Sequence, residues 1–416
     1  MARNQQVQAS LEEQNIRGFA SLKFADFRLL WLTSPISSIG QATQRFANAY
    51  QVYELSGSSA QLGLTFLFQA LPQIFLGFFG GTLADKFDRK KLININQGTQ
   101  ILLAAFLGVL TFTGSIQVWH IYAVTFFASC VRQIEQPARQ SIIPSLVPRE
   151  YILNASTLNL TVGRLSQFAG PMAAGVLVAA VGLSAAYFVN AVLLLPAFFV
   201  IRMVHLQDSP SRRALKINLR TVFEGLEFAI ASRVLIAFIA LDFVVQTMGY
   251  FQAMMPVIAK DVLGQGPVGL GMLMSAPSFG SLAGFIILLL IGNIKRKGLV
   301  HVGSIVIFCA MLFAFSRSSW FVLSLVLAGG LGFVDSVGMA IRQTTLQLLA
   351  PDEKRGRVMA VNWVISGGAD SLGGAYLGFM AFLVGIQTAL AMGAVTGGAM
   401  ALAYLLFWKK VRNFTG

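Results

Sequence analysis

The stretch GGTLADKFDRKKL (residues 80–92) places two aspartates and several bases between two long apolar runs. The residues before it, 58–79, are almost all apolar, and the residues after it, 93–113, are apolar again. A charged segment between two such runs must lie on the water side of whatever buries them. The composition of the whole chain indicates what that is.

The chain has the composition of a membrane protein. It is 56% hydrophobic and 12% charged, whereas soluble domains have about 25% charged residues. A helix that spans a bilayer needs about 20 mostly apolar residues, and about twelve windows of this length cover most of the chain. They lie near residues 28–54, 58–80, 92–113, 117–136, 152–180, 183–202, 232–260, 267–292, 298–316, 320–346, 357–382 and 386–408. The sequence therefore predicts an all-α membrane protein with twelve transmembrane helices.

The net charge of +14 is distributed unevenly along the chain. Bases cluster in alternate connecting segments, for example at residues 86–91, 212–220, 295–297 and 409–412, and the intervening segments carry almost none. This is the positive-inside pattern, which predicts that both termini are cytoplasmic. The charge therefore indicates an orientation in the lipid bilayer, and no nucleic-acid partner is expected. The first 27 residues contain no apolar core, so no cleavable signal peptide is expected.

The chain repeats itself at about half its length. ARQSIIPSLVPREYILNASTLN (138–159) and IRQTTLQLLAPDEKRGRVMAVN (341–362) align without gaps, at an offset of 203 residues. Half-repeats of this kind are typical of transporters whose substrate site lies between the halves. We therefore predict a cytoplasmic N-terminal segment, two six-helix bundles in pseudo-symmetric arrangement separated by a cytoplasmic loop, and a cytoplasmic tail. Their ranges are 1–27, 28–203, 204–231, 232–408 and 409–416.

The opening stretch resembles a loop of a known family. Residues 81–91 are similar to the loop between spans two and three of the major facilitator superfamily, whose pattern is Gly-x-Leu-Ala-Asp-Arg-x-Gly-Arg-Lys. The matching residues are Gly81, Leu83, Asp85, Arg89 and Lys90, while Asp88 stands where the family has glycine. The resemblance implies a cytoplasmic gate that latches the two halves together. A topology anchor with no mechanical part is the alternative.

Other segments narrow the resemblance to one branch. PDEKRGRVMAVN (351–362) is similar to drug–proton antiporters that include macrolide efflux proteins and secretion transporters of the enterobactin-exporter type. GRLSQFAGPMAAG (163–175) resembles the Gly-x-x-x-Gly-Pro pattern that superfamily antiporters carry in the fifth span. There Gly170 permits close packing and Pro171 disrupts the helix ladder, which favours export, although a plain kinked helix is the alternative. Arg164 in the same segment is a buried polar candidate.

Polar and aromatic residues inside two predicted spans are candidates for a substrate cavity. In the first span they recur at helical spacing, which indicates one polar face, and an ionisable group there is a functional candidate. In the seventh span, MGYFQAMMP (248–256) offers Met and aromatic side chains that adapt to varied apolar ligands, although core packing is the alternative. The candidates are Gln41, Gln44, Arg45, Asn48, Tyr250, Phe251, Gln252 and Met255. Arg45 would allow an anionic group on the substrate.

Charged residues inside the other spans suggest how transport is driven. A carboxylate in a low-dielectric surrounding binds a proton more readily, so it can load and release one near neutral pH. Asp242, Asp335 and Asp370 are therefore the candidates for proton coupling, and structural pairing between helices is the alternative. Arg132 and Glu135, spaced i, i+3, are expected to form a structural ion pair.

Nothing in the sequence indicates an enzyme, a metal site or a cofactor. The histidines His120, His205 and His301 lack metal-ligand spacing, and no nucleotide-binding loop occurs. The predicted function is proton-coupled export of a hydrophobic or amphipathic small molecule, such as a drug, macrolide or siderophore. The protein is expected to act as a monomer in the inner (cytoplasmic) membrane. A lipid or lysolipid translocator, and a non-transporting membrane sensor or assembly factor, are the alternatives.

Overall fold

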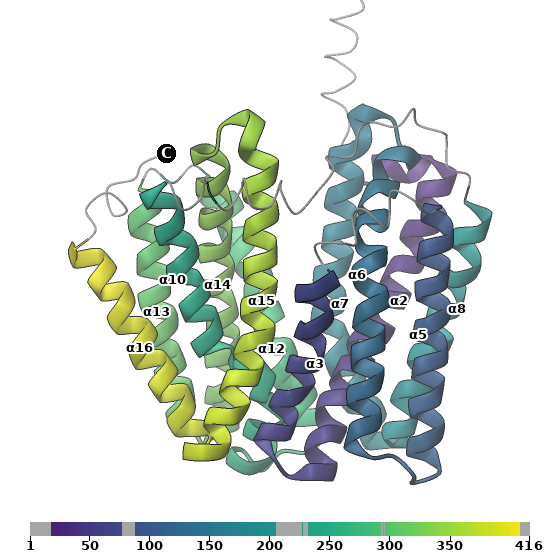
Figure 1. Cartoon of the computed structure of the whole chain (residues 1–416), viewed down its shortest axis with the longest axis horizontal. Coiled ribbons are helices and arrows are strands. Elements are labelled where there is room, and N and C mark those ends of the chain that lie inside the picture. Colours follow the sequence, from purple (N-terminus) through teal and green to yellow (C-terminus); the bar gives the residue numbers. More distant parts are fainter. Residues whose placement is uncertain are drawn as a thin grey trace, which may run out of the picture.

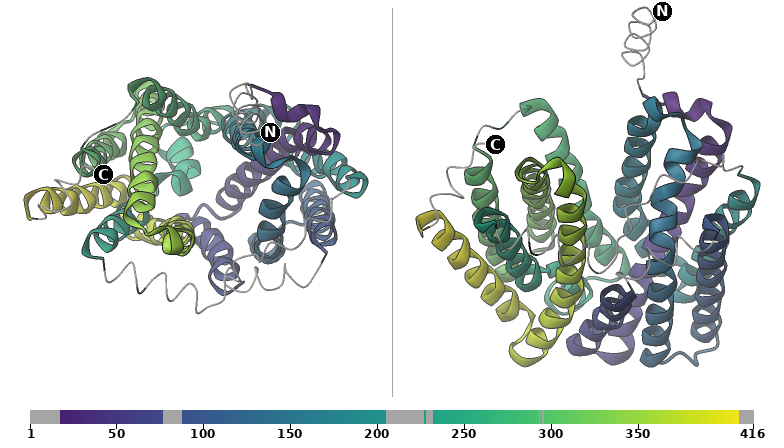
Figure 2. Two further views of the ribbon diagram at one scale, coloured as in Figure 1. Left: turned by 90° about the horizontal axis from the view of Figure 1, so that it is seen from above. Right: turned by 45° about the horizontal axis from the view of Figure 1, so that its top comes forward.

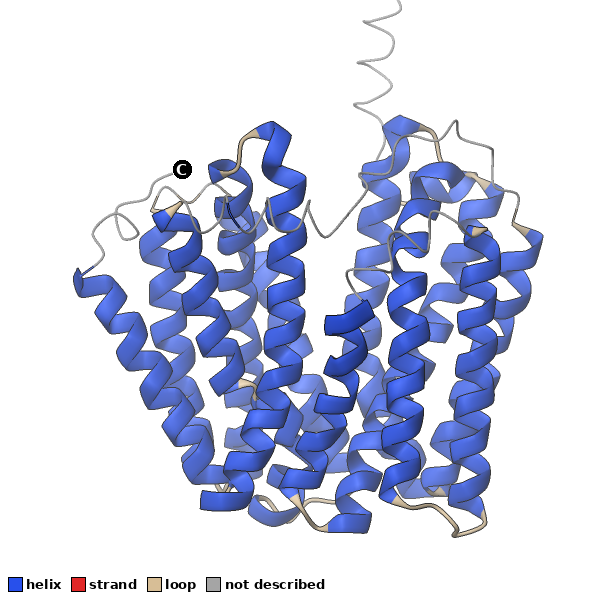
Figure 3. Cartoon of the chain, viewed as in Figure 1, coloured by secondary structure: helices blue, strands red, loops and turns tan. Residues whose placement is uncertain are grey.

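The computed structural model describes residues 18–76, 88–204, 227, 232–292, 294 and 296–407. Every regular element within these ranges is helical (Figure 3). The first half contains η1 (Ala20–Lys23), α2 (Ala25–Ser56), α3 (Ser59–Leu76), α5 (Arg89–Phe112), α6 (Val118–Leu146), η2 (Arg149–Tyr151), α7 (Ile152–Val181) and α8 (Leu183–Met203). The second half contains α10 (Arg233–Gly249), η3 (Phe251–Met254), α11 (Met255–Val257), η4 (Ile258–Val262), α12 (Pro267–Ile291), α13 (Lys297–Arg317), α14 (Phe321–Leu349), α15 (Asp352–Val384) and α16 (Ile386–Phe407).

The long helices of the described residues correspond one to one with the twelve predicted spans. Seven of them are long and apolar enough to cross a membrane by length and composition alone, namely α5, α7 with η2, α8, α12, α13, α14 and α16. The other five are α2, α3, α6, α10 and α15. Each of these five carries polar side chains into a cavity between the two halves, and α10 is also only 17 residues long.

The helices form two bundles, as predicted. Figures 1 and 2 show α2, α3 and α5 to α8 on one side and α10 to α16 on the other. The main contacts within the first bundle join α5 to α8 and α2 to α7 and α8, and those within the second join α12 to α14 and α13 to α16. The bundles contact each other mainly through α7 with α12 and α3 with α15.

The bundles separate toward one end of the molecule and meet at the other (Figure 1). We call the end where α2 begins and α16 ends the open end, and the end where α2 ends and α3 begins the closed end. The largest hydrophobic cluster combines buried residues of both bundles, such as Phe46 and Leu62 from the first and Met254 and Leu273 from the second. The remaining clusters each belong to one bundle. The shared core therefore holds the bundles together at the closed end.

Glycines allow the two bundles to approach each other closely. A Cβ atom added to Gly271 of α12 would lie 2.6 Å from the carbonyl oxygen of Pro171 and 3.2 Å from the Cα of Gly175, both in α7. A Cβ atom on Gly63 of α3 would lie 3.0 Å from the Cα of Gly378 in α15. Small residues at helix contacts bring backbones together in membranes. Gly175 and Gly378 are equivalent in the sequence repeat. Both contacts between the bundles therefore depend on a glycine at the same position of the repeat.

Candidate functional site

A cavity of about 620 Å³ lies between the two bundles. We call it the central cavity. Its charged lining residues are Arg45, Arg132, Arg164, Asp335, Arg342 and Asp370. A second space of about 260 Å³, the side pocket, shares part of this lining and extends between α2, α3, α5 and α6.

The polar face of α2 lines these spaces. Gln41, Gln44, Arg45 and Asn48 all border the side pocket, whereas Phe46 on another face of the helix is fully buried in the shared core. Gln44 also accepts a hydrogen bond from the Nδ2 of Asn190 in α8. The helical spacing of this polar face therefore places several amides and one guanidinium along a single wall.

The seventh span is interrupted where it meets the cavity. α10 ends at Gly249, Tyr250 leaves helical geometry (φ −74°, ψ 61°), and a 3-10 turn, η3, follows. Gly249, Tyr250, Phe251 and Gln252 all line the central cavity. Irregular backbone at membrane depth is tolerated where it borders a cavity, and broken helices mark binding sites in transporters. The continuous span predicted here from the sequence is therefore wrong, because Gly249 lacks a side chain and Pro256 lacks a backbone donor.

Met255, another cavity candidate, lies elsewhere. Its side chain is 1% exposed and belongs to the shared core at the closed end. The structure therefore places Tyr250, Phe251 and Gln252 at the cavity and Met255 in the packing that closes the molecule.

Three arginines of the first bundle face the central cavity. Arg45 comes from α2, Arg132 from α6 and Arg164 from α7. Arg164 contacts the sulfur of Met339 at 3.9 Å and lies over the ring of Phe285 at 5.4 Å, across the bundle contact. This wall of the cavity is therefore basic.

The ion pair predicted between Arg132 and Glu135 is replaced by another. The buried carboxylate of Glu135 accepts from the Nε of Arg139 at 2.8 Å, one helical turn further along α6. A spacing of i, i+4 and one of i, i+3 both bring side chains together on a helix. Arg139 is the residue that pairs with Glu135, and Arg132 faces the central cavity instead.

Two of the three candidate coupling acids line the central cavity. Asp335 comes from α14 and Asp370 from α15, so the acidic wall belongs to the second bundle. Within the part of the chain that the structure describes, neither carboxylate lies within ion-pair distance of a base. Both are therefore exposed to solvent or substrate entering the cavity.

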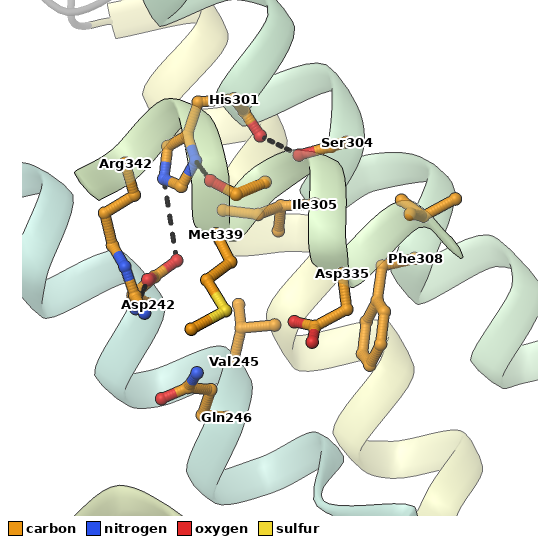
Figure 4. A pocket seen from close by; sticks show the side chains of 12 residues that line it. Asp242, Val245, Gln246, His301, Ser304, Ile305, Phe308, Asp335, Met339 and Arg342 are labelled. Atoms are coloured by element: carbon orange, nitrogen blue, oxygen red, sulfur yellow. Dashed lines mark hydrogen bonds and ion pairs between the residues drawn. The ribbon is translucent and has the colours of Figure 1, made fainter. Parts of the chain in front are cut away.

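Asp242 has a different environment. Its carboxylate contacts the guanidinium of Arg342 from α14 and lies 3.5 Å from the Nε2 of His301 in α13 (Figure 4). The Nδ1 of His301 lies 3.3 Å from the carbonyl oxygen of Gly338. Arg342 and His301 are both buried. Asp242 therefore joins three helices of the second bundle, in a small pocket that it shares with Asp335 and Arg342 from the lining of the central cavity.

Neither Arg342 nor His301 is predicted from the sequence to be a functional residue. The repeat contained a signal for Arg342, because it aligns with Arg139 at the offset of 203 residues. Both arginines are held by a carboxylate, Glu135 on the same helix and Asp242 on a neighbouring helix. His301 carried no signal, since its partners lie far away in the sequence.

The antiporter-like segment of α7 lies between the bundles. A Cβ atom on Gly170 would overlap the side chain of Ala42 in α2, so glycine permits this close packing. Pro171 lies inside the helix and borders the central cavity. This segment of α7 thus packs against α2 and also belongs to the contact between α7 and α12.

Two polar contacts join the bundles at the closed end. The hydroxyl of Tyr53 donates to the carboxylate of Asp261, and the Nζ of Lys260 donates to Glu54 at 3.1 Å. Tyr53 and Glu54 lie in the last turn of α2, and the other two residues lie in η4. We call these four residues the closed-end contact, because they bridge the two bundles where the cavity is shut.

The predicted gate loop falls largely outside the described residues. Gly81, Leu83 and Asp85 are not described, whereas Arg89 and Lys90 begin α5. Asp88 caps this helix, and its Oδ1 accepts from the backbone N–H groups of Lys90 at 2.8 Å and Lys91 at 3.2 Å. The departure from the family glycine therefore supplies a helix N-cap.

The comparison with known families identifies the chain. Among the described residues, no group of three His, Cys, Asp or Glu could hold a metal ion. A cavity between two six-helix bundles is the arrangement of a transporter. The family model of transmembrane secretion effectors matches residues 16–414. The chain belongs to this family of major facilitator superfamily transporters and is a multi-pass membrane protein, not an enzyme.

Individual relatives agree with this assignment. Macrolide efflux protein A of Streptococcus pyogenes is 26% identical over 289 residues, which are 67% of this chain and 70% of the relative. Enterobactin exporter EntS of Shigella boydii is 23% identical over 395 residues, 93% of each chain. Matches to curated relatives span from 48% to 93% of their length.

One solved structure shows the same fold. A bacterial homologue of the human lysosomal transporter Spinster, in an inward-facing and unoccupied conformation, superposes with a TM-score of 0.71 at 13% identity. The match covers 94% of this chain and 98% of that one. The twelve-helix, two-bundle architecture predicted from the sequence is therefore confirmed.

Proposed function

We propose that this transporter exports a hydrophobic or amphipathic small molecule, of the kind represented by drugs, macrolides and siderophores, in exchange for protons. One observation carries the proposal: Asp335 and Asp370 face the same cavity as the polar face of α2 and the aromatic break of the seventh span. Substrate and protons therefore share one space that can face either side in turn. The efflux functions named for two relatives support the outward direction.

The distribution of charge supports an orientation for the molecule. Arg89, Lys90, Arg149 and Arg355 lie at the open end, whereas the bases at the closed end are Lys260 and Arg317 among the described residues. By the positive-inside rule the open end is cytoplasmic, so both termini lie on that side of the inner membrane. The central cavity then receives substrate from the cytoplasm, in a monomer.

Proton coupling follows from the position of the two cavity acids. When the closed end opens, protons from outside neutralise Asp335 and Asp370 and displace the substrate. In the low-dielectric interior of the protein, neutral carboxyl groups cost less free energy than charged ones while the cavity changes sides. The protonated protein therefore returns to the state in which its cavity faces the cytoplasm. Asp242 is already paired with Arg342, and we assign it a structural part. In this scheme the loop at 81–91 would close the cytoplasmic side.

The proposal is tested with purified protein in proteoliposomes under an imposed pH gradient. The substrates are dyes, a macrolide and a catecholate siderophore, and the readouts are gradient-driven transport and counterflow without a gradient. Asp335→Asn and Asp370→Asn are compared with wild type, and Glu227→Gln, which changes an exposed carboxylate outside the cavity, is the matched control.

The two readouts separate coupling from binding. We expect at least one cavity variant to lose gradient-driven transport while it keeps counterflow, and the control to keep both. Transport that ignores the pH gradient in wild type would contradict proton coupling. Folded protein that moves no member of the panel would contradict the proposed substrate class.

A further inference from the structure

The side pocket has an unusual charge for its depth in the protein. It contains two arginines, Arg45 and Arg132, and neither a lysine nor an acidic residue. Among the described residues neither arginine forms an ion pair. The acids of the central cavity, Asp335 and Asp370, do not border the side pocket. Two like charges therefore face the same small space without a carboxylate between them.

Other polar groups around the side pocket also lack partners. The side-chain oxygens of Asn48, Thr65 and Thr125 are buried and accept or donate no hydrogen bond, and all three residues line the pocket. A buried polar group without a partner destabilises the folded state, and charged groups at membrane depth are rare unless they serve a function. The pocket is therefore bordered by several polar side chains that have no hydrogen-bond partner among the described residues.

The remaining wall suits an aromatic or apolar body. Phe66 of α3 and Tyr250 at the break of the seventh span meet edge to face, with ring centroids 6.0 Å apart. Met274 of α12 lies beside them in the same lining. The pocket thus combines two arginines with aromatic and methionine side chains in one lining.

We propose that the side pocket binds the anionic group of an amphipathic organic anion, a carboxylate, sulfonate or phosphate attached to an aromatic or apolar body. Arg45 and Arg132 bind the anionic oxygens, the hydroxyls of Thr65 and Thr125 donate to them, and the body packs against Phe66 and Tyr250. Guanidinium groups recognise such anions by charge-assisted hydrogen bonds. This inference rests on the proposed export function and narrows its substrate class from any amphipathic molecule to an anion.

The inference is tested by binding, which needs no transport. The protein is reconstituted in phosphatidylcholine nanodiscs, and empty nanodiscs give the background. The probes are 8-anilinonaphthalene-1-sulfonate and its uncharged analogue N-phenyl-1-naphthylamine, which differ in the sulfonate. We expect wild type to bind the sulfonate at least about tenfold more tightly, since a hydrogen bond to a charged group corresponds to about tenfold or more.

Variants assign this preference to the side pocket. Arg45→Gln/Arg132→Gln should lose the preference for the sulfonate, and Arg45→Lys/Arg132→Lys should keep most of it, which excludes misfolding as the cause. Arg317→Gln removes an exposed arginine at the closed end whose guanidinium lies over the ring of Phe313, and it should bind like wild type. Equal affinity for both probes, no binding of the sulfonate, or a preference that survives in the glutamine variant would overturn the inference.

Two further arms complete the test. Phosphatidylglycerol added to the nanodiscs should leave sulfonate affinity unchanged, and competition by this lipid would overturn the assignment in favour of a lipid headgroup. Preference for the anion without gradient-driven transport would contradict the proposed function alone. Proton-driven transport without a preference for the anion would contradict this inference alone.

Discussion

Arg342 illustrates how one residue can organise a bundle. Its guanidinium contacts Asp242 on α10, and Asp242 also lies near His301 on α13 (Figure 4). The side chain of Arg342 is 4% exposed and that of Asp242 is 13% exposed, so each charge depends on the other. A buried pair of this kind contributes little net stability, but removal of one partner leaves an uncompensated charge.

This environment leads to a prediction about stability. Asp242→Asn and Arg342→Gln should each destabilise the protein by about 3–5 kcal/mol, because each leaves one buried charge. The double variant should recover part of this loss. Thermal melting in detergent, followed by size-exclusion chromatography, measures all three. Equal loss in the single and double variants would show that the two side chains do not depend on each other.

Glycines govern the structure at the level of the helices. The contacts of α7 with α12 and of α3 with α15 bring backbones together at Gly271 and Gly378. These contacts run toward the closed end, where Tyr53 and Glu54 meet Asp261 and Lys260. Close helix packing and the closed-end contact therefore stabilise the same conformation.

A bulky residue at Gly378 should oppose this conformation. A Cβ atom there would lie 2.7 Å from the carbonyl oxygen of Ser59 and 2.9 Å from the nitrogen of Gly63, and backbone atoms cannot rotate away. We expect Gly378→Val to open the closed end and to raise hydrogen–deuterium exchange several-fold in residues 251–262. Gly368→Val on the same helix is the control, since nothing lies within 4 Å of a Cβ atom there. Unchanged exchange in Gly378→Val would mean that the helices can shift without opening.

The elements differ in how far the sequence predicts them. The twelve spans were predictable because an apolar run of membrane length has few alternatives. The break at Tyr250 was not, because the segment is apolar throughout and glycine and proline, here Gly249 and Pro256, are also tolerated inside continuous membrane helices. Helical spacing was enough to predict that Gln41 and Arg45 share one face of α2. The position of Met255 depends on the break at Tyr250, so its predicted place in the cavity was wrong.

The ion-pair partner of a charged residue was harder to predict than the helix face on which a residue lies. Glu135 had two arginines within reach on α6, and spacing alone does not decide between them. Asp242 and Arg342 are 100 residues apart in the sequence, so only the packing of α10 against α14 brings them together. The assignment of coupling to Asp335 and Asp370, and of a gate to residues 81–91, stays a prediction.

At the scale of the whole molecule, the charges that face the cavity without an ion-pair partner among the described residues differ between the bundles, since Arg342 of the second bundle is paired with Asp242. Arg45, Arg132 and Arg164 belong to the first bundle, and Asp335 and Asp370 belong to the second. If an anion binds the basic wall and leaves the cell while protons enter on the acidic wall, both movements carry positive charge inward. Export of an anion should therefore respond to the membrane potential as well as to the pH gradient.

This electrogenic exchange can be measured in proteoliposomes loaded with the anilinonaphthalene sulfonate. Valinomycin and a potassium gradient make the interior negative, and an internal pH dye reports proton entry. Each elementary charge contributes about 2.3 kcal/mol at 100 mV, so exit of the anion should accelerate and be accompanied by acidification of the interior. Asp335→Asn/Asp370→Asn should abolish the acidification, and protein-free liposomes show the passive leak. Exit that acidifies the interior but is unaffected by the potential would mean that another ion balances the charge, and the anion-for-proton exchange would then be wrong.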